Sequence, residues 1–365
     1  MEKNPDLRLQ LDPAVHDLSV TAISVLQRGE IPYASNKYPV GFMTDFSTDH
    51  RQVICGEETR HNSSHGGGYG HVMLLNLRNL VEPVSRGDLI SAFDPDYPPL
   101  CYACDDARTQ GGVVIWCHNG RGMEVPVAAA LGKLDAFNLF DPCWKEKEYD
   151  LWYLLLNCGI HLPASTGSDW FICSNNRVYV QTGESFNYES WLRGLQAGRT
   201  FITNGPALLF EVEGQAPGST LDAAPSSGRL STRVEWTTHY LLNRIEIVAD
   251  GQIVHSRTLS QQAEQREGVW EVDVPSEQDG WLAARAYGES RDSFDQPVYA
   301  HTSPVYIGTG RPPSAVKEAA TFFQQAIDDA HVQIRDYARF TKDEQREEVL
   351  HLFAEGRKVY EDLLG

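Results

Sequence analysis

The sequence predicts an α/β domain, then an all-β domain and a helical tail. Three observations carry this prediction. Apolar runs alternate with helix-favouring segments up to about residue 203; short strands of alternating hydrophobicity follow at intervals of about ten residues; and the last part of the chain has apolar residues at helical spacing. We therefore expect a β/α barrel-like domain at 1–203, a β-sandwich at 204–312 and an amphipathic helical tail at 313–365.

Length and charge narrow the class of protein. The 365 residues contain 41% hydrophobic residues, enough to bury a core in two or more domains. A formal net charge of −19 argues against a nucleic-acid partner, because binding the phosphate backbone needs clustered Lys and Arg. The sequence has no apolar run of about 20 residues and no signal-peptide pattern at its start, so we expect a cytoplasmic protein with no membrane partner.

The first domain is expected from its alternating pattern. AISVL can form a strand in the otherwise ambiguous first 50 residues. From 52 to 170 the apolar runs QVIC, HVMLL, GVVIW, AFNLF and LPAS are separated by segments that favour helix at 125–132 and 146–158. Strand and helix in alternation predict a mostly parallel sheet or barrel. SFNYESWLRGLQAG then predicts a closing helix that Gly198 caps before a new strand.

The remaining elements follow from periodicity. The segments ALLFEVEG, RLSTRVEWTT, RIEIVADGQIVHS, VWEVDVP, GWLAARAYG and SPVYIG alternate with period two, as strands of a β-sandwich do. ADGQ is a plausible hairpin turn. From Pro313 onward, two amphipathic helices are expected, with a break near FTKDE. Their apolar faces could pair two copies of the chain into a homo-oligomer.

Four side chains of metal-ligating type lie at the ends of apolar runs. They are Glu58 in ICGEE, His71 at the start of its run in GHVMLL, His118 after GGVVIW and Asp169 after LPASTGS. Open α/β sheets and β/α barrels carry their chemistry at strand ends, so we expect the four side chains to converge on a metal site. Mixed carboxylate and imidazole ligands accept Zn, Mn or Fe, and we expect one or two such ions.

The seven cysteines offer a different metal site. An odd number without a secretory signal predicts reduced thiols. Cys101, Cys104, Cys117 and His118 could form a tetrahedral zinc centre. The alternative is that CYACDDA runs into a helix with its thiols packed inward, and that Cys117 fills core space.

The ordered motifs carry a family resemblance. GEE, GHV, GGVVIWCHNG and TGSD, followed by LQAGRTFITNGP and a segment ending in HTSPVYIG, resemble the carbaryl hydrolase (CehA/McbA) branch of the polymerase and histidinol phosphatase (PHP) metallohydrolases over about residues 15–310. The resemblance implies a distorted β/α barrel of PHP type with divalent metals at its strand ends, followed by an immunoglobulin-like sandwich. It also implies hydrolysis of esters, carbamates or phosphoesters, with a small molecule as substrate.

The resemblance also assigns roles to the four ligand candidates. Glu58 matches the family's bridging glutamate, His71 the histidine that follows it, His118 the histidine of a later strand end and Asp169 the aspartate near the end of the barrel. Glu57 could take the place of Glu58. A water bound to the metal would then be the nucleophile.

The sequence departs from the family at three ligand positions. No H-x-H pair opens the first strand, where DLSVTAI has Ser19 instead of a histidine, and Trp170 and Phe171 follow Asp169 where the family has D-x-H. We therefore expect an incomplete barrel that has lost its first strand or strands. His16 or His50 could supply a missing ligand. His61 and His65 belong to a glycine-rich segment that is more typical of a solvated loop.

Two functions remain open. In the first, the chain is a metal-dependent hydrolase in which Arg121 stabilises charge on the substrate and Asn119 donates a hydrogen bond to it. In the second, the barrel is a non-catalytic scaffold, and the β-sandwich binds a partner or a glycan.

Overall fold

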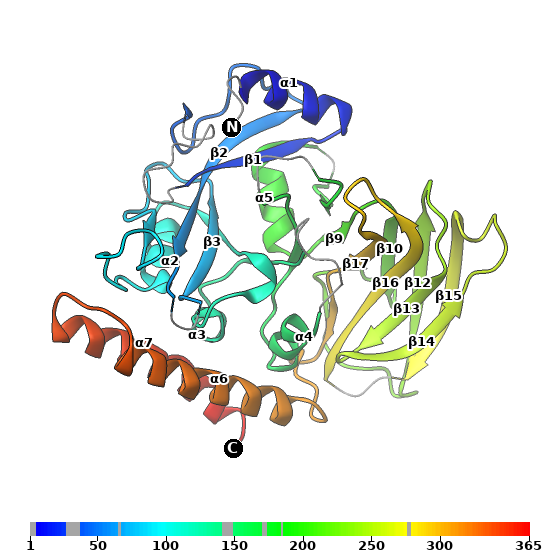
Figure 1. Cartoon of the computed structure of the whole chain (residues 1–365). Coiled ribbons are helices and arrows are strands. Elements are labelled where there is room, and N and C mark those ends of the chain that lie inside the picture. The colour runs from blue at the N-terminus through cyan, green and yellow to red at the C-terminus, as the bar shows by residue number, and fades with distance from the viewer. Residues whose placement is uncertain are drawn as a thin grey trace. The chain divides into compact units, whose positions relative to one another are not determined.

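The computed structural model describes residues 5–26, 37–64, 67–140, 149–169, 174–183, 185–275 and 279–365, in which seven α-helices and eighteen strands form a mixed α/β fold (Figure 1). His65, Trp170, Phe171 and the predicted start of a helix at 146–148 lie outside these residues. Contacts divide the chain into two compact units. The first comprises Met1–Asp135, Gly183–Leu192 and Phe322–Asp362, and the second comprises Ala136–Thr182, Arg193–Thr321 and Leu363–Gly365. The domain boundaries predicted at 203 and 312 stay a prediction.

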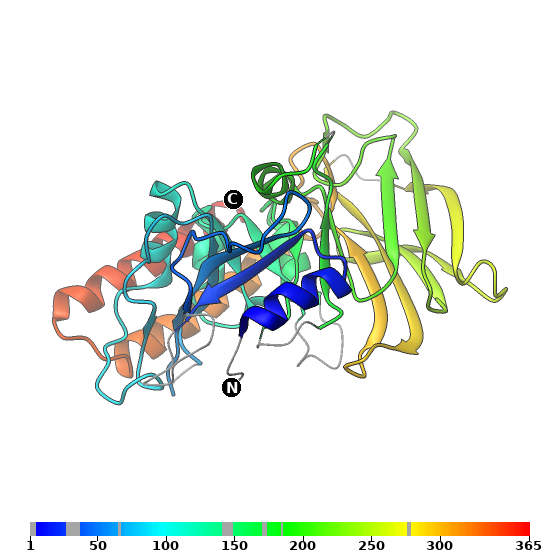
Figure 2. The ribbon, with the colours of Figure 1, turned by 90° about the horizontal axis from the view of Figure 1, so that it is seen from above.

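The first unit is built on a small mixed sheet. Its elements up to residue 135 are α1 (Pro5–Val15), β1 (Val20–Val25), β2 (Gln52–His61), β3 (Gly70–Leu75), β4 (Ser85–Arg86), α2 (Leu100–Thr109), β5 (Val113–Trp116), the 3-10 turn η2 (His118–Gly120) and α3 (Val125–Ala130). β2 pairs in parallel with β1 and β4, and antiparallel with β3, which in turn pairs antiparallel with β5. Figure 2 shows α1 and β1, both blue, from above.

The sheet is mixed: β1, β2, β4 and β5 run in the same direction, as expected of a mostly parallel sheet, and β3 runs antiparallel to its neighbours β2 and β5. Only residues 62–69 connect β2 to β3. A parallel crossover needs a dozen or more residues, so this short connection returns the chain in the opposite direction. β2 is nevertheless buried along almost its whole length, which explains why its sequence looks like a strand of a covered parallel sheet.

Helix α2 is held at its start by a buried carboxylate. Glu124 accepts hydrogen bonds from the backbone N–H groups of Leu100 (2.8 Å) and Cys101 (2.7 Å), and its side chain is fully buried. These N–H groups have no partner within the helix, and a negative charge is favourable at this end of the helix dipole. Cys101 and Cys104 lie on the buried face of α2, so CYACDDA does run into a helix with its thiols packed inward.

The C-terminal tail forms the two helices that the sequence predicts, α6 (Val316–Asp336) and α7 (Asp343–Asp362), with a break near FTKDE. They run antiparallel, since the Phe323 ring stacks on Tyr360 and Arg357 pairs with Asp328 at 2.7 Å. The Tyr360 hydroxyl donates to the carbonyl of Pro126, which joins α7 to α3. Residues Phe322–Asp362 therefore complete the first unit.

The second unit consists mainly of two sheets over one core. Its elements are β6 (Ala136–Asn138), α4 (Asp150–Asn157), β7 (Ala164–Ser165), β8 (Arg177–Val180), β9 (Thr200–Thr203), β10 (Ala207–Val212), β11 (Thr220–Leu221), β12 (Arg229–Thr237), β13 (Arg244–Ala249), β14 (Gln252–Thr258), β15 (Glu267–Pro275), β16 (Gly280–Arg291), β17 (Pro297–Thr302) and β18 (Val305–Ile307). β10, β12 and β15 form one sheet, and β8, β9, β11, β13, β14 and β16 to β18 form the other. Burial alternates along β12, so one face meets the shared core.

Two turns confirm local predictions. Asp250 and Gly251 connect β13 to β14 with φ values of 52° and 86°, which is the left-handed pair that a tight hairpin requires. The helix α5 (Tyr188–Gln196), which contributes residues to both units, ends before Gly198, whose φ of 70° suits a helix C-terminus, and β9 follows.

A buried polar chain runs through the second unit. The Tyr153 hydroxyl donates to His301 Nε2 at 2.6 Å, and His301 Nδ1 donates to the carbonyl of Thr302 at 2.7 Å. Arg285 donates to the Tyr153 oxygen (3.2 Å) and to Glu246 (2.6 Å). Burial lowers the pKa of His301 to about 3, against the smaller effect of its bond to Thr302, so the imidazole is neutral at neutral pH.

None of the described helices combines the length and the apolar composition needed to span a bilayer.

Removing the buried cap should destabilise the protein. We expect Glu124→Ala to lower the free energy of unfolding by about 2–4 kcal/mol, because two buried N–H groups lose their acceptor. Glu124→Gln keeps one carbonyl acceptor and should cost less. Urea unfolding followed by tryptophan fluorescence measures both. Glu355→Ala, at an exposed position of α7, serves as the control and should change the free energy of unfolding by less than about 0.5 kcal/mol. Equal values for Glu124→Ala and Glu355→Ala would contradict the capping role.

His301 should make the second unit sensitive to acid. Because its pKa is lowered from 6.5 to about 3 on folding, the unfolded state binds one more proton between these values. Stability is therefore lost as the pH falls from about 6.5 toward 3, by at most about 1.4 kcal/mol per pH unit. Urea midpoints measured across this range should fall less steeply for His301→Gln than for the wild type. His239→Gln, at an exposed histidine, should keep the wild-type slope; a wild-type slope in His301→Gln would disprove the assignment.

Candidate metal centre

Three of the four predicted ligands converge at one face of the first-unit sheet. Glu58 lies on β2, His71 is the second residue of β3 and His118 follows β5 by two positions. Arg60 lies directly opposite His71 in the antiparallel pairing, and Glu58 is two residues before Arg60. Residues opposite each other and residues two apart share a face of a sheet, so the side chains of Glu58, Arg60 and His71 point the same way.

The ligand atoms centre on one carboxylate oxygen. Glu58 Oε1 lies 3.4 Å from His71 Nδ1 and 3.7 Å from His118 Nε2. The two imidazole rings meet edge to face with centroids 4.9 Å apart, and the three ligand atoms lie within 4.8 Å of one another. Glu58 is buried, and the side chains of both histidines are about 15% exposed. The cluster is thus largely shielded from water.

An unusual backbone conformation presents His118. Both His118 and Asn119 have a φ of 54°, a left-handed conformation that is rare for residues with a side chain and common at functional sites. The loop then passes close to β3 at Gly122, where a Cβ atom would lie 2.2 Å from the Tyr69 carbonyl oxygen. Glycine is therefore required at this point, and it keeps the HNGRG loop beside His71.

Asn62 determines which ring nitrogen of His71 carries the proton. His71 Nε2 lies 2.9 Å from Asn62 Oδ1, which can only accept a hydrogen bond, so the imidazole proton is on Nε2. His71 Nδ1 then carries a lone pair that faces Glu58. This nitrogen is buried and makes no hydrogen bond to any described residue. A buried polar atom without a partner is costly, and a cation would satisfy this one.

The charge states also suit a cation. Burial alone would raise the pKa of Glu58, but the neighbouring His118 imidazole and the Arg60 guanidinium outweigh it and hold the pKa well below its usual value. Burial lowers the pKa of His71 to about 4, although Glu58 opposes the shift. The cluster thus offers an ionised carboxylate and a neutral imidazole, which are the forms that bind metals.

The spacing fits a single ion. Ligands about 2.0–2.1 Å from a tetrahedral zinc ion lie about 3.4 Å from one another. The separations of 3.4 Å and 3.7 Å from Glu58 Oε1 are close to this value. Glu58, His71 and His118 could therefore hold one ion after a small adjustment of the His118 side.

The other ligand candidates do not belong to the cluster found among the described residues. Asp169 belongs to the second unit, where it is exposed and has a φ of 57°, and its role as a ligand stays a prediction. Glu57 points away from Glu58, because neighbouring residues of a strand face opposite sides. It is buried beside Val81, whose N–H it accepts at 2.7 Å. His16 and His50 are exposed, and neither belongs to the ligand cluster found among the described residues.

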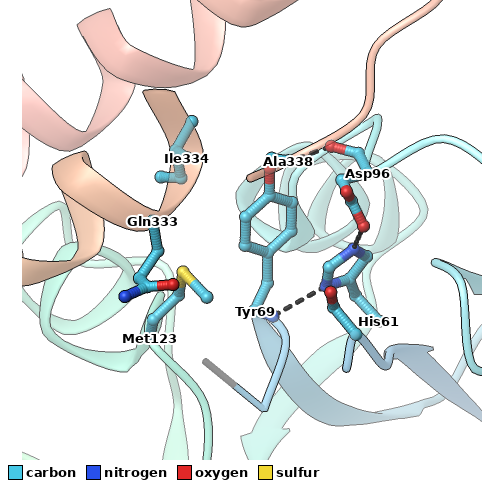
Figure 3. A pocket seen from close by; sticks show the side chains of 8 residues that line it. His61, Tyr69, Asp96, Met123, Gln333, Ile334 and Ala338 are labelled. Carbon is cyan, nitrogen blue, oxygen red and sulfur yellow. Dashed lines mark hydrogen bonds and ion pairs between the residues drawn. The ribbon is translucent and has the colours of Figure 1, made fainter. Parts of the chain in front are cut away.

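His61 is committed to a separate interaction (Figure 3). Tyr69 N–H donates to His61 Nδ1 at 2.7 Å, so the proton is on Nε2, which donates to Asp96 at 2.7 Å. Arg339 N–H donates to the other Asp96 oxygen at 2.7 Å. Both ring nitrogens are therefore occupied, and His61 supplies neither a metal ligand nor a general base in this arrangement. The small pocket beside it is lined by His61, Ser63, Tyr69, Asp96, Met123, Gln333, Ile334 and Ala338.

The two predicted substrate contacts, Asn119 and Arg121, both follow His118 in the HNGRG loop. Asn119 is half-buried, and its Oδ1 is a buried atom that makes no hydrogen bond within the described part of the chain. Arg121 is exposed, and its backbone carbonyl accepts from the Trp116 indole at 3.2 Å. Their roles in catalysis stay predictions. Cys117 is buried and, like the thiols of α2, is not among the three ligands that meet in the described residues.

Sequence reasoning missed Arg60 and Asn62. Both follow Glu58 at intervals of two residues, in Glu58-x-Arg60-x-Asn62: Arg60 lies on the same face of β2 as Glu58, and Asn62 comes directly after the end of β2. Period two counted from Glu58 would have identified them. Arg60 Nη2 lies 2.5 Å from Glu58 Oε1.

No protein-family model matches this chain, and a comparison with curated proteins finds no significant match.

Without the Asn62 amide, the His71 proton should no longer be confined to Nε2. In Asn62→Ala the two ring nitrogens should share the proton, which long-range ¹H–¹⁵N NMR of the metal-free protein detects. Zinc affinity should fall about 10- to 100-fold, as it does when a group that orients a ligand is lost. Asn79→Ala, at an exposed position of the same unit, is the matched control and should leave both measurements unchanged. A His71 ring that keeps its proton on Nε2 in Asn62→Ala would refute the role of Asn62.

Proposed function

We propose that this chain is a metal-dependent hydrolase whose ion is held by Glu58, His71 and His118. The observation that supports it most is the convergence of these three ligand atoms within 4.8 Å, with the buried His71 Nδ1 lacking a hydrogen-bond partner among the described residues. Two histidines and one glutamate form a ligand set of catalytic zinc sites, which leave a further position open for water or substrate. A structural zinc site has four protein ligands instead.

A divalent ion at this cluster would lower the pKa of a coordinated water and so supply a nucleophile near neutral pH. The residues of the chain would bind the ion and orient the substrate. Glu58 supplies the negative charge, Asn62 keeps the His71 proton away from the ion, and no side chain has to act as the nucleophile. We assign Asn119 to a hydrogen bond with the substrate and Arg121 to its charge, because both lie in the loop that His118 begins.

We infer the ions and the substrate from chemistry and resemblance. Imidazole and carboxylate ligands accept Zn, Mn and Fe, and Asp169 would be the additional ligand if a second ion binds. The substrate is a small molecule with an ester, carbamate or phosphoester bond. We place the chain in the CehA/McbA branch of the PHP metallohydrolases, with an incomplete barrel and an immunoglobulin-like sandwich. The order of the motifs and the two sheets over one core support this placement. The antiparallel pairing of β3 with β2 and with β5 argues against a regular barrel.

One observation favours the alternative, a non-catalytic scaffold. Arg60 lies 2.5 Å from Glu58, and both side chains are only 9% exposed. An arginine in this position neutralises the carboxylate as a metal ion would. In the alternative, Arg60 replaces the ion permanently, and the second unit carries the binding function.

Metal content separates the two functions. Protein dialysed against Zn²⁺ or Mn²⁺ should retain about one equivalent per chain, measured by elemental analysis, because three ligands from one face are in place. Glu58→Ala, His71→Ala and His118→Ala should each lose it, whereas His239→Ala, at an exposed histidine of the second unit, should not. Asp169→Ala should lose metal only if Asp169 is a ligand.

Activity provides the second measurement. The loaded protein should hydrolyse 4-nitrophenyl acetate or bis(4-nitrophenyl) phosphate, and the three ligand variants should not. Wild-type protein that retains no metal and leaves both compounds intact would refute the hydrolase proposal. Full retention of metal by His118→Ala and Glu58→Ala would show that the ion binds elsewhere.

A further inference from the structure

Arg60 occupies the oxygen on which the proposed metal site centres. Its Nη2 atom lies 2.5 Å from Glu58 Oε1, the same atom that lies 3.4 Å from His71 Nδ1 and 3.7 Å from His118 Nε2. A carboxylate oxygen this close to a guanidinium already has a strong, charge-assisted hydrogen bond. A metal ion that binds Oε1 would therefore compete with Arg60 for this oxygen.

The displaced guanidinium would have few partners of its own. Arg60 is buried, its side chain is 9% exposed, and its Nε is a buried atom without a hydrogen bond to any described residue. An arginine side chain does not lose its proton in proteins. Arg60 therefore stays charged whether or not the ion is present, and it lies beside His71, its partner across the ladder.

A divalent ion would give the cluster an excess of positive charge. Without an ion, Glu58 and Arg60 form an ion pair without net charge. A divalent ion adds two positive charges to a site whose carboxylate and guanidinium are both shielded from water. Buried charge without compensation is unfavourable by several kcal/mol. An anionic group would remove this excess, and a neutral ester or carbamate would not.

We propose that Arg60 and the metal ion compete for Glu58, and that ion binding frees Arg60 to hold an oxyanion of the substrate, a phosphate or a carboxylate. This inference rests on the proposed function, since it concerns the same site. The planar guanidinium presents parallel N–H donors that match the two oxygens of such a group. Arg60 is thus a specificity-determining residue that selects oxyanionic substrates over neutral ones.

The test measures Zn²⁺ binding by full-length protein, by competition with a chromophoric chelator, alone and with excess methylphosphonate or acetate. The variants are Arg60→Met, Arg60→Gln and Arg60→Lys, with Arg78→Met at an exposed position of the same unit as control. Without anion, Arg60→Met and Arg60→Gln should bind Zn²⁺ about 10-fold more tightly than wild type, because the competing charge is gone. Arg60→Lys keeps the charge and should stay near wild type.

The anions test the second half of the proposal. Methylphosphonate should tighten Zn²⁺ binding by wild type at least about fivefold more than by Arg60→Met, because binding of two ligands is coupled reciprocally. A larger effect of methylphosphonate than of acetate identifies a phosphate-type substrate, and the reverse identifies a carboxylate. Far-UV circular dichroism confirms that each variant is folded, and Arg60→Gln and Arg60→Lys stand in if Arg60→Met is not.

The outcomes separate the two proposals. If wild type binds Zn²⁺ and the neutral variants bind it equally or more weakly, with the same effect of the anions, the role of Arg60 is refuted and the hydrolase proposal stands. If neither wild type nor any Arg60 variant binds Zn²⁺, both proposals are refuted. If only Arg60→Met and Arg60→Gln bind it, competition is supported, and the wild-type chain is the non-catalytic scaffold.

Discussion

The antiparallel ladder of β2, β3 and β5 is the constraint on which the candidate metal centre depends. Its register places Arg60 opposite His71, and the pairing of β3 with β5 brings His118 to the same edge. Because side chains alternate along a strand, a slip of one residue between β2 and β3 would turn Glu58, Arg60 and Asn62 away from His71. The geometry of the cluster is thus a direct product of strand pairing. On the opposite face of β2, His61 accepts a hydrogen bond from the N–H of Tyr69, the residue before β3.

Much of this arrangement could be predicted from sequence, because it depends on local patterns. Apolar runs located the strands that carry Glu58 and His71 and the strand that precedes His118, and helical spacing located α6 and α7. Asp250 and Gly251 were recognisable as a hairpin turn, since few residue pairs accept two positive φ values. These features depend on a few neighbouring residues, so one sequence is enough to find them.

What could not be predicted depends on pairing between distant segments. A buried apolar run does not indicate the direction of its strand. Only the short connection between β2 and β3 indicated that these two strands run antiparallel. Arg60 and Asn62 were overlooked because each is ordinary in composition and gains its meaning only from a position opposite or beside His71. Asp96 likewise shows no signal in sequence, since its partners are His61 and the backbone of Arg339.

The contribution of Phe322–Asp362 to the first unit also bears on how the chain folds during synthesis. Asp96 bonds the backbone of Arg339, and Tyr360 bonds the carbonyl of Pro126, so contacts that complete this unit join residues more than two hundred positions apart. Contacts of such sequence separation form slowly. On the ribosome, the strands that carry Glu58 and His71 emerge long before α6 and α7, so the bonds of Asp96 and Pro126 can form only after Arg339 and Tyr360 have been synthesised.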